Sequence, residues 1–134
     1  MTIQMREDFR WHPVSSIAEM REYYRSKLPA AREAAREHGY ALCVHGSEER
    51  DFDIVAVPWV EAAVSKDELV SILHYIFSGG CVSQSYPWEE KPHGRIATSF
   101  PVLWLEYPGC LEDSVFRAGS GCVDLSILPR GDAK

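Results

Sequence analysis

The chain has little positive charge, few cysteines and no long apolar run. It carries 14 Lys and Arg against 20 Asp and Glu over 134 residues, for a formal net charge of −6. It therefore lacks the basic excess that duplex nucleic acid demands, and we do not expect that partner. No apolar stretch approaches the roughly 20 residues that span a bilayer, and the first residues lack the apolar middle of a signal peptide. We expect a cytoplasmic protein with no membrane partner.

Cysteine spacing excludes further classes of protein. The four cysteines lie far apart, and none forms a C-x-x-C pair or stands at zinc-ligand spacing from a histidine: Cys43, Cys81, Cys110 and Cys122. These spacings fit neither a zinc site nor a typical disulfide framework, and we favour free thiols over both. We therefore expect reduced, metal-free thiols. The chain length fits one domain, 1–134, with a single core.

Three helices are predicted from capping and apolar spacing. Ser16 and Glu19 form a capping box that starts a first helix. Pro29 is suited to the first position of a second helix, which Gly39 would end. A further capping box precedes an apolar stripe that predicts a helix at 65–78.

Several strands are predicted from apolar runs and from alternation. The candidates are 40–45 (YALCVH), 54–57 (IVAV), 81–86 (CVSQSY), 95–100 (RIATSF), 102–107 (VLWLEY) and 122–128 (CVDLSIL). The first two should form an antiparallel hairpin because few residues separate them. We expect 105–121 to be mainly a long connection, a lid or a partner surface. Helices followed by strands in this order predict an α+β fold with a mixed, mostly antiparallel sheet.

Three aspartates stand out against these apolar runs. Asp51 and Asp53 are two residues apart, so on one strand they share a face. Asp124 lies in the otherwise apolar strand 122–128. If that strand lies beside Asp53, the three carboxylates converge into a hard-oxygen site suited to Mg²⁺ or Mn²⁺. The alternative is that these aspartates form turns or cap strand ends.

The same residues carry a family resemblance. The segments HGSEERDFDIVAVPW and CVDLSILP resemble the DNA polymerase beta-like nucleotidyltransferase superfamily, in particular its small stand-alone phage or bacterial members. The pattern is an apolar strand ending in Gly46 and Ser47, a D-x-D at Asp51 and Asp53, and a single acid, Asp124, on a later strand. It covers less than a quarter of the chain.

The resemblance implies a fold and a chemistry. The fold would be a mixed, twisted sheet with its helices packed on one face. Asp51, Asp53 and Asp124 would be the catalytic, metal-holding residues, with Mg²⁺ or Mn²⁺ assisting nucleotidyl transfer from a nucleoside triphosphate to an unidentified acceptor. Gly46 and Ser47 would let the phosphates approach the backbone and bond to it.

One departure from the family keeps a second function open. Only Glu48, Glu49 and Arg50 separate Gly-Ser from D-x-D, where the family has roughly eight or more residues and a short helix facing the phosphates. This short gap favours a non-catalytic protein that binds or sequesters a nucleotide, or docks a partner. The three retained acids favour the enzyme, because a binder of anionic phosphates has no use for uncompensated carboxylates.

Other residues are weighed between a site and a structural role. Lys91 and Arg95, with His93 between them, would contribute positive charge for phosphates, or else form a solvated turn. Trp59 would stack on a base or, as we favour, close the core. His45 would act as a base or contact phosphate, or else be an ordinary strand histidine, which we favour.

Overall fold

The computed structural model describes residues 10–14, 17–46, 48, 51–78, 85–106 and 115–129. For residues 10–14, 17, 103–106 and 115–120 only the backbone is described. The elements in chain order are β1 (Arg10–Val14), α1 (Ile17–Glu37), β2 (Tyr40–His45), β3 (Asp51–Pro58), α2 (Lys66–Phe77), β4 (Glu89–Glu90), the 3-10 turn η1 (Pro92–Gly94), β5 (Ile96–Glu106) and β6 (Val115–Ile127).

The strands form one mixed sheet in the order β2-β3-β6-β5-β4, with β1 also paired to β6. The pairs β3–β6 and β1–β6 are parallel, and the other three pairs are antiparallel. β5 pairs with β6 from Arg117 to Ile127. The parallel strands β1 and β3 therefore share the opposite edge of β6, one after the other. The expected α+β class, the β2–β3 hairpin and the adjacency of strands 40–45, 51–58 and 122–127 are confirmed.

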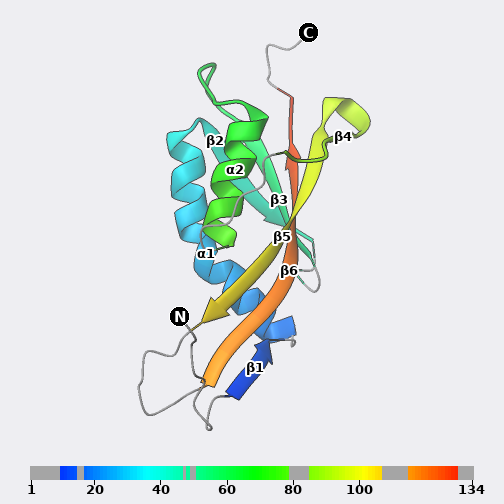
Figure 1. Cartoon of the computed structure of the whole chain (residues 1–134). Coiled ribbons are helices and arrows are strands. Elements are labelled where there is room, and N and C mark those ends of the chain that lie inside the picture. Colours follow the sequence, from blue (N-terminus) through cyan, green and yellow to red (C-terminus); the bar gives the residue numbers. More distant parts are fainter. Residues whose placement is uncertain are drawn as a thin grey trace.

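Both helices pack on one face of the sheet, and this face holds the core (Figure 1). Alternation along β3 makes the division plain, because Phe52, Ile54 and Ala56 are fully buried while Asp53 and Val55 are only partly so. The ring of Tyr24 from α1 stacks on Phe52 at a centroid distance of 4.7 Å. Each large apolar side chain buried here contributes roughly 1.5–3 kcal/mol. The other face of the sheet carries the polar residues.

The first helix, α1, is one continuous helix of 21 residues. The prediction of two separate helices in this region is therefore wrong. Pro29 lies inside α1 rather than at the start of a second helix. Proline has no backbone N–H, so the Arg25 carbonyl lacks its hydrogen-bond donor within the helix. Because Pro29 is exposed, water can hydrogen-bond to that carbonyl instead. The buried Ala31 and Ala35 continue the core-facing stripe past the proline. Gly39, at a φ of 96°, ends the helical turn as expected.

The late strands are longer than predicted. Residues 95–100 and 102–107 were expected as separate strands, but β5 runs unbroken through Pro101. A proline is tolerated there because β4 pairs only with Ile96 and Ala97, leaving the rest of that edge free of a described strand. Part of the connection expected at 105–121 is also strand, because β5 continues to Glu106 and β6 begins at Val115.

Two differences from the predicted strands remain. The strand β1 was not predicted from the sequence. In the expected strand 81–86, positions 81–84 lie outside the described residues, and Ser85 and Tyr86 are not in a strand.

The helix predicted at 65–78 is confirmed as α2. The hydroxyl of Ser65 caps it by accepting a hydrogen bond from the N–H of Glu68 at 3.2 Å. Its apolar stripe is buried, and α1 meets it where the Tyr23 hydroxyl donates to the Phe77 carbonyl. Within the described chain, neither helix has the length and apolar composition needed to cross a membrane.

Candidate functional site

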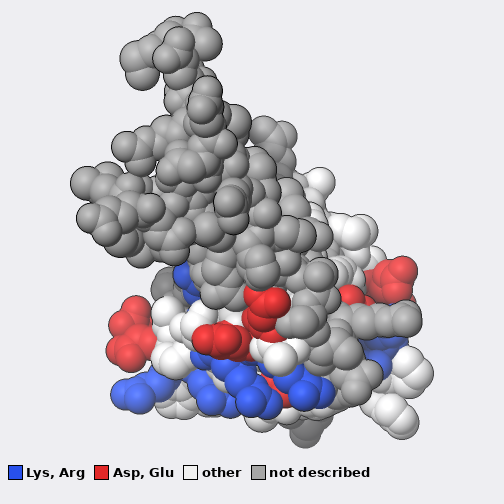
Figure 2. All heavy atoms as spheres, turned by 90° about the horizontal axis from the view of Figure 1, so that it is seen from below, with Lys and Arg blue, Asp and Glu red and all other residues white. Residues whose placement is uncertain are grey.

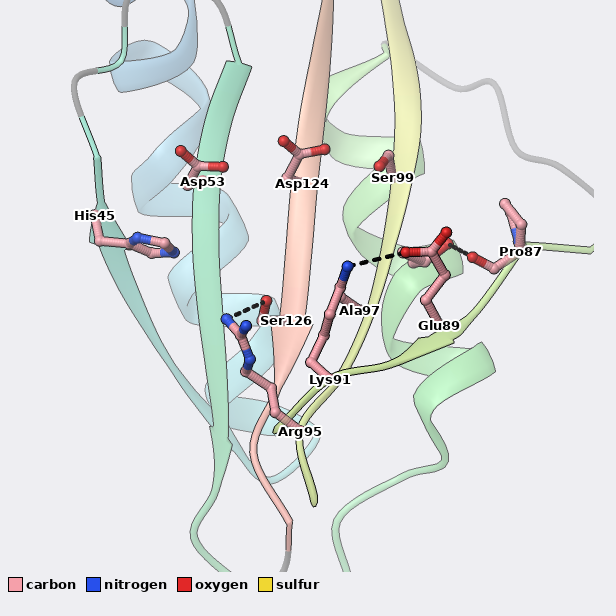
Figure 3. Close-up of a pocket in the computed structure, with 11 residues that line it drawn as sticks. His45, Asp53, Pro87, Glu89, Lys91, Arg95, Ala97, Ser99, Asp124 and Ser126 are labelled. Carbon is pink, nitrogen blue, oxygen red and sulfur yellow. Dashed lines mark hydrogen bonds and ion pairs between the residues drawn. The ribbon is translucent and has the colours of Figure 1, made fainter. Parts of the chain in front are cut away.

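A row of polar side chains crosses the open face of the sheet. His45 on β2 is opposite Asp53 on β3, Asp53 is opposite Asp124 on β6, and Asp124 is opposite Ser99 on β5. Residues in register on neighbouring strands share a face and stand about 4.8 Å apart. Figure 3 shows the four side chains in line across the four strands. Residues as far apart in the chain as His45 and Asp124 thus lie in one row.

Asp53 and Asp124 are the electrostatic centre of this row. Like charges directly opposite on a sheet repel. The pKa of Asp53 is raised, first by partial burial and then by the charge of Asp124, while His45 opposes the rise. Both aspartates lie inside strands rather than at turns. The alternative that these two residues form turns or caps is therefore wrong.

The lack of a side chain at Gly46 leaves space for the Asp53 carboxylate. A Cβ on Gly46 would lie 2.5 Å from Oδ2 of Asp53, closer than real Cβ contacts allow. Gly46 also has a φ of 81°, which side-chain-bearing residues adopt at a cost. A glycine at position 46 is therefore required by the nearby Asp53 carboxylate as well as by the backbone conformation.

Asp51 is opposite Cys122, and this pair is the next one on the same face of the sheet, two residues before Asp53 and Asp124 on their strands. The Cys122 thiol lies 3.7 Å from Oδ1 of Asp124. Burial, and then the charges of Asp124 and Asp51, raise the pKa of Cys122 to about 11. This thiol therefore stays protonated at neutral pH and is a poor nucleophile.

The row from His45 to Ser99 lines a cavity with a volume of about 360 Å³. Basic side chains line the other side of this cavity. Arg95 Nη1 donates to the Ser126 hydroxyl at 3.3 Å, and Lys91 Nζ lies 3.0 Å from Oε2 of Glu89 (Figure 3). The cavity thus holds carboxylates on β3 and β6 and cations on the segment that follows β4. Such a division suits a ligand that brings both a metal ion and phosphate groups.

The segment that carries the cations is tied to the rest of the fold. The Lys91 N–H donates to the Arg95 carbonyl at 2.7 Å and closes the turn around η1. Thr98 Oγ1 donates to the Pro87 carbonyl at 3.0 Å, and Trp88 Nε1 donates to Asp67 on α2 at 2.8 Å. These bonds position Lys91 and Arg95 beside the acidic row.

The structure brings together most of the predicted site residues. Those that line the cavity or adjoin it are Gly46, Asp51, Asp53, Lys91, Arg95 and Asp124. Ser47 lies outside the described residues. His45 lines the cavity, so the reading of it as an ordinary strand histidine is incomplete. His93 is not among the residues that line it.

Trp59 is a clear correction. It is 59% exposed, so it does not close the core as we had favoured. It does not line the cavity either. The reason lies in its place after β3, where the Trp59 N–H donates to the Gly39 carbonyl and the side chain is left outside the sheet.

Sequence reasoning missed six residues that line the cavity: Pro87, Glu89, Ala97, Thr98, Ser99 and Ser126. The available signal was alternation, because Ser99 lies between the buried Thr98 and Phe100, and Ser126 belongs to the same alternating strand as Asp124. Serines are too common in strands for that signal to stand out without the register.

The charge of Glu48, which would repel a triphosphate, is partly neutralised. Arg25 on α1 forms an ion pair with it at 2.9 Å, and the Glu48 side chain is only 16% exposed. Seen from below, the described part of the surface shows Lys and Arg side chains beside Asp and Glu side chains rather than a single basic field (Figure 2).

The carboxylates fit a divalent metal only in part. Among the residues described, no group of three or more His, Cys, Asp or Glu side chains is arranged to hold a metal ion. The paired Asp53 and Asp124 nevertheless offer hard oxygen donors in register. Mg²⁺ is commonly bound by one or two carboxylates and completed by substrate phosphates and water. The fit is therefore to a two-carboxylate site that a phosphate ligand completes.

The thiols that the structure describes agree with the expectation of reduced cysteines. Cys43 and Cys122 are free. Cys81 and Cys110 lie outside the described residues, so their state stays a prediction.

Comparisons of the chain with models of protein families, with curated proteins and with solved structures find no match.

Proposed function

We propose that the protein is a minimal nucleotidyltransferase that uses Mg²⁺ or Mn²⁺ to transfer a nucleotidyl group from a nucleoside triphosphate to an acceptor. The observation that carries this proposal is the pairing of Asp53 with Asp124 on the open face of the sheet, with Arg95 and Lys91 across the same cavity. Two carboxylates that repel each other are costly in a sheet, and a bound cation would remove that cost.

The chain's residues would divide the work as follows. Asp53 and Asp124 would hold the metal, with Asp51 at the margin, and the metal would neutralise phosphate charge and lower the barrier to in-line displacement. Arg95 and Lys91 would bind phosphate oxygens, each exchanging a present partner, Ser126 or Glu89, for the ligand. The acceptor hydroxyl would form a bond to the α-phosphorus and lose its proton, and pyrophosphate would leave.

A second candidate is a non-catalytic nucleotide-binding protein. The observation that favours it is the short connection between β2, which ends at His45, and β3, which begins at Asp51. That span leaves no room for the helix that faces the phosphates in the superfamily that the sequence resembles. Such a protein would bind the metal–nucleotide complex in the same cavity without transferring it.

Thermal unfolding tests the proposal directly. Mg²⁺ or Mn²⁺ should raise the melting temperature of the wild type, and a nucleoside triphosphate should enlarge the shift. Asp53→Asn should abolish both shifts, while Glu37→Gln, which removes one charge from an exposed position on α1, should abolish neither. A labelled triphosphate incubated with candidate acceptors then separates transfer from binding. No metal response in the wild type would overturn both candidate functions.

A further inference from the structure

One polar contact from the helix face of the sheet reaches the backbone of β6 close to Asp124. The Tyr24 hydroxyl accepts a hydrogen bond from the Cys122 N–H at 3.1 Å and donates one to the Cys122 carbonyl at 3.3 Å. Cys122 is two residues before Asp124 on β6. A tyrosine hydroxyl can serve as donor and acceptor at once, and both roles are filled here by one backbone unit.

The contact falls at a weak point of the sheet. On the edge of β6 away from β5, β1 pairs with residues 115–119 and β3 pairs with residues 122–127. Ser120 and Gly121 lie between these two ladders and have no described strand partner on that edge. Cys122 is thus the first residue of β6 that pairs with β3, and a strand is least constrained where one ladder ends and the next begins.

Gly121 is the residue that allows the contact. A Cβ at Gly121 would collide with the Tyr24 hydroxyl and would lie 2.6 Å from Cε of Met20. Glycine inside a strand often marks a place where another group approaches the backbone closely. The absence of a side chain at 121 and the hydroxyl at 24 therefore belong to one arrangement.

The same tyrosine also holds the other strand of the pair. Its ring stacks on Phe52 with an interplanar angle of 12°. Phe52 lies between Asp51 and Asp53, with its side chain on the helix face. Burial raises the pKa of Tyr24 to about 12, so the hydroxyl keeps its proton and remains able to donate.

We propose that Tyr24 is a positioning residue that holds β6 in the place where Asp124 faces Asp53, with its hydroxyl on β6 and its ring on β3. This inference rests on the proposed function for its consequence, the affinity for metal. Tyr24 does not touch the cavity and acts only through the two strands. It sets the spacing of the carboxylates before any ligand arrives.

Tyr23 provides a matched control on the same helix. It is also buried, and its hydroxyl also donates to a backbone carbonyl, that of Phe77 on α2. Tyr23→Phe and Tyr24→Phe therefore each remove one buried hydroxyl from α1, and both should lower the melting temperature. Among the hydrogen bonds that the structure describes for these two hydroxyls, the bond from Tyr24 is the one that reaches a strand carrying a site carboxylate.

Binding of Mn²⁺ alone, followed by electron paramagnetic resonance, and amide hydrogen exchange along β6 test the proposal. Tyr24→Phe should weaken Mn²⁺ binding roughly tenfold, the low end for groups that orient metal ligands. It should also speed exchange at Cys122 and Asp124, while Tyr23→Phe leaves both readouts at their wild-type values. Equal behaviour of the two variants in both readouts would overturn the positioning role and leave the proposed function standing. A wild type that binds no Mn²⁺ would overturn the proposed function. In that case faster exchange in Tyr24→Phe alone would still support the positioning role, and unchanged exchange would remove it.

Discussion

Asp53 and Asp124 stand directly opposite each other on two neighbouring parallel strands, although 70 other residues separate them along the chain. The pKa of Asp53 is raised by burial and by the charge of Asp124. The pair is thus held together by the sheet against its own repulsion. Four predictions test the consequences for stability, geometry, ligand binding and thiol reactivity.

The first prediction concerns pH without metal. The pKa of Asp53 is raised in the folded state, so the folded protein holds that proton more tightly than the unfolded chain does. Stability from this group is present below the unfolded pKa and is lost as pH rises through the folded pKa. Asp53→Asn does not lose stability in this way, so its stability relative to the wild type should rise as pH rises above the ordinary pKa of an aspartate. Urea unfolding of both proteins measures the difference. A difference that does not change with pH would contradict the raised pKa.

The second prediction concerns the turn before β3. Gly46→Ala forces a side chain into a left-handed conformation at a φ of 81° and against the Asp53 carboxylate. It should cost about 1–2 kcal/mol for the backbone alone and should also displace Asp53, weakening the metal-dependent rise in melting temperature.

Gly94 is the control for that experiment. It has a φ of 76°, but a Cβ there would meet only Pro129 at an ordinary 3.5 Å. Gly94→Ala should therefore pay a similar backbone cost and leave the metal response intact. The account of Gly46 fails if the two variants respond to metal alike.

The third prediction separates the basic side of the cavity from the acidic side. Arg95→Gln removes a charged donor that faces the cavity from the end of η1. A hydrogen bond to a charged group is worth about 1.5–3 kcal/mol, so binding of a nucleoside triphosphate should weaken roughly tenfold or more. Binding of Mn²⁺ alone should not change, because Arg95 touches neither carboxylate in the described contacts.

Calorimetric titration with a triphosphate, with and without Mn²⁺, measures that effect. Arg32→Gln is the control, because Arg32 is exposed on α1 and does not line the cavity. An Arg95→Gln protein that binds the triphosphate as tightly as the wild type would remove this residue from the binding site.

The fourth prediction uses Cys122 as a reporter of the Asp124 charge. The charge of Asp124 helps to raise the pKa of Cys122 to about 11. Asp124→Asn should lower that pKa, increase the thiolate fraction and speed alkylation of Cys122. Exposed Cys43, on β2, should react at the same rate in both proteins and serves as the internal control. Mass spectrometry of iodoacetamide-treated protein resolves the two sites, and equal Cys122 rates would contradict the assignment of the charge.

The sequence alone determined the local features of this protein. The capping box at Ser65 specified the start of α2, and Gly39 specified the end of α1, because both act through bonds and angles within a few residues. The alternation around Asp124 placed that acid on a strand, on the face opposite to the face of its apolar neighbours. The spacing of Asp51 and Asp53 predicted that they share a face if they lie on one strand. The continuity of α1 through Pro29 was not readable, because exposure of the broken carbonyl to water depends on where the helix packs.

Only the tertiary structure decided which residues meet. The register of β3 on β6 pairs Asp53 with Asp124, and a shift of one residue would have turned one of them into the core. The segment that carries Lys91 and Arg95 is placed across from that pair by two hydrogen bonds just before β4. One joins Pro87 to Thr98 on β5, and the other joins Trp88 to Asp67 on α2, 21 positions away. The Tyr24 contact with Cys122 joins residues 98 positions apart. Such placements follow from closing a sheet around one core, and no pattern within a short stretch of sequence encodes them.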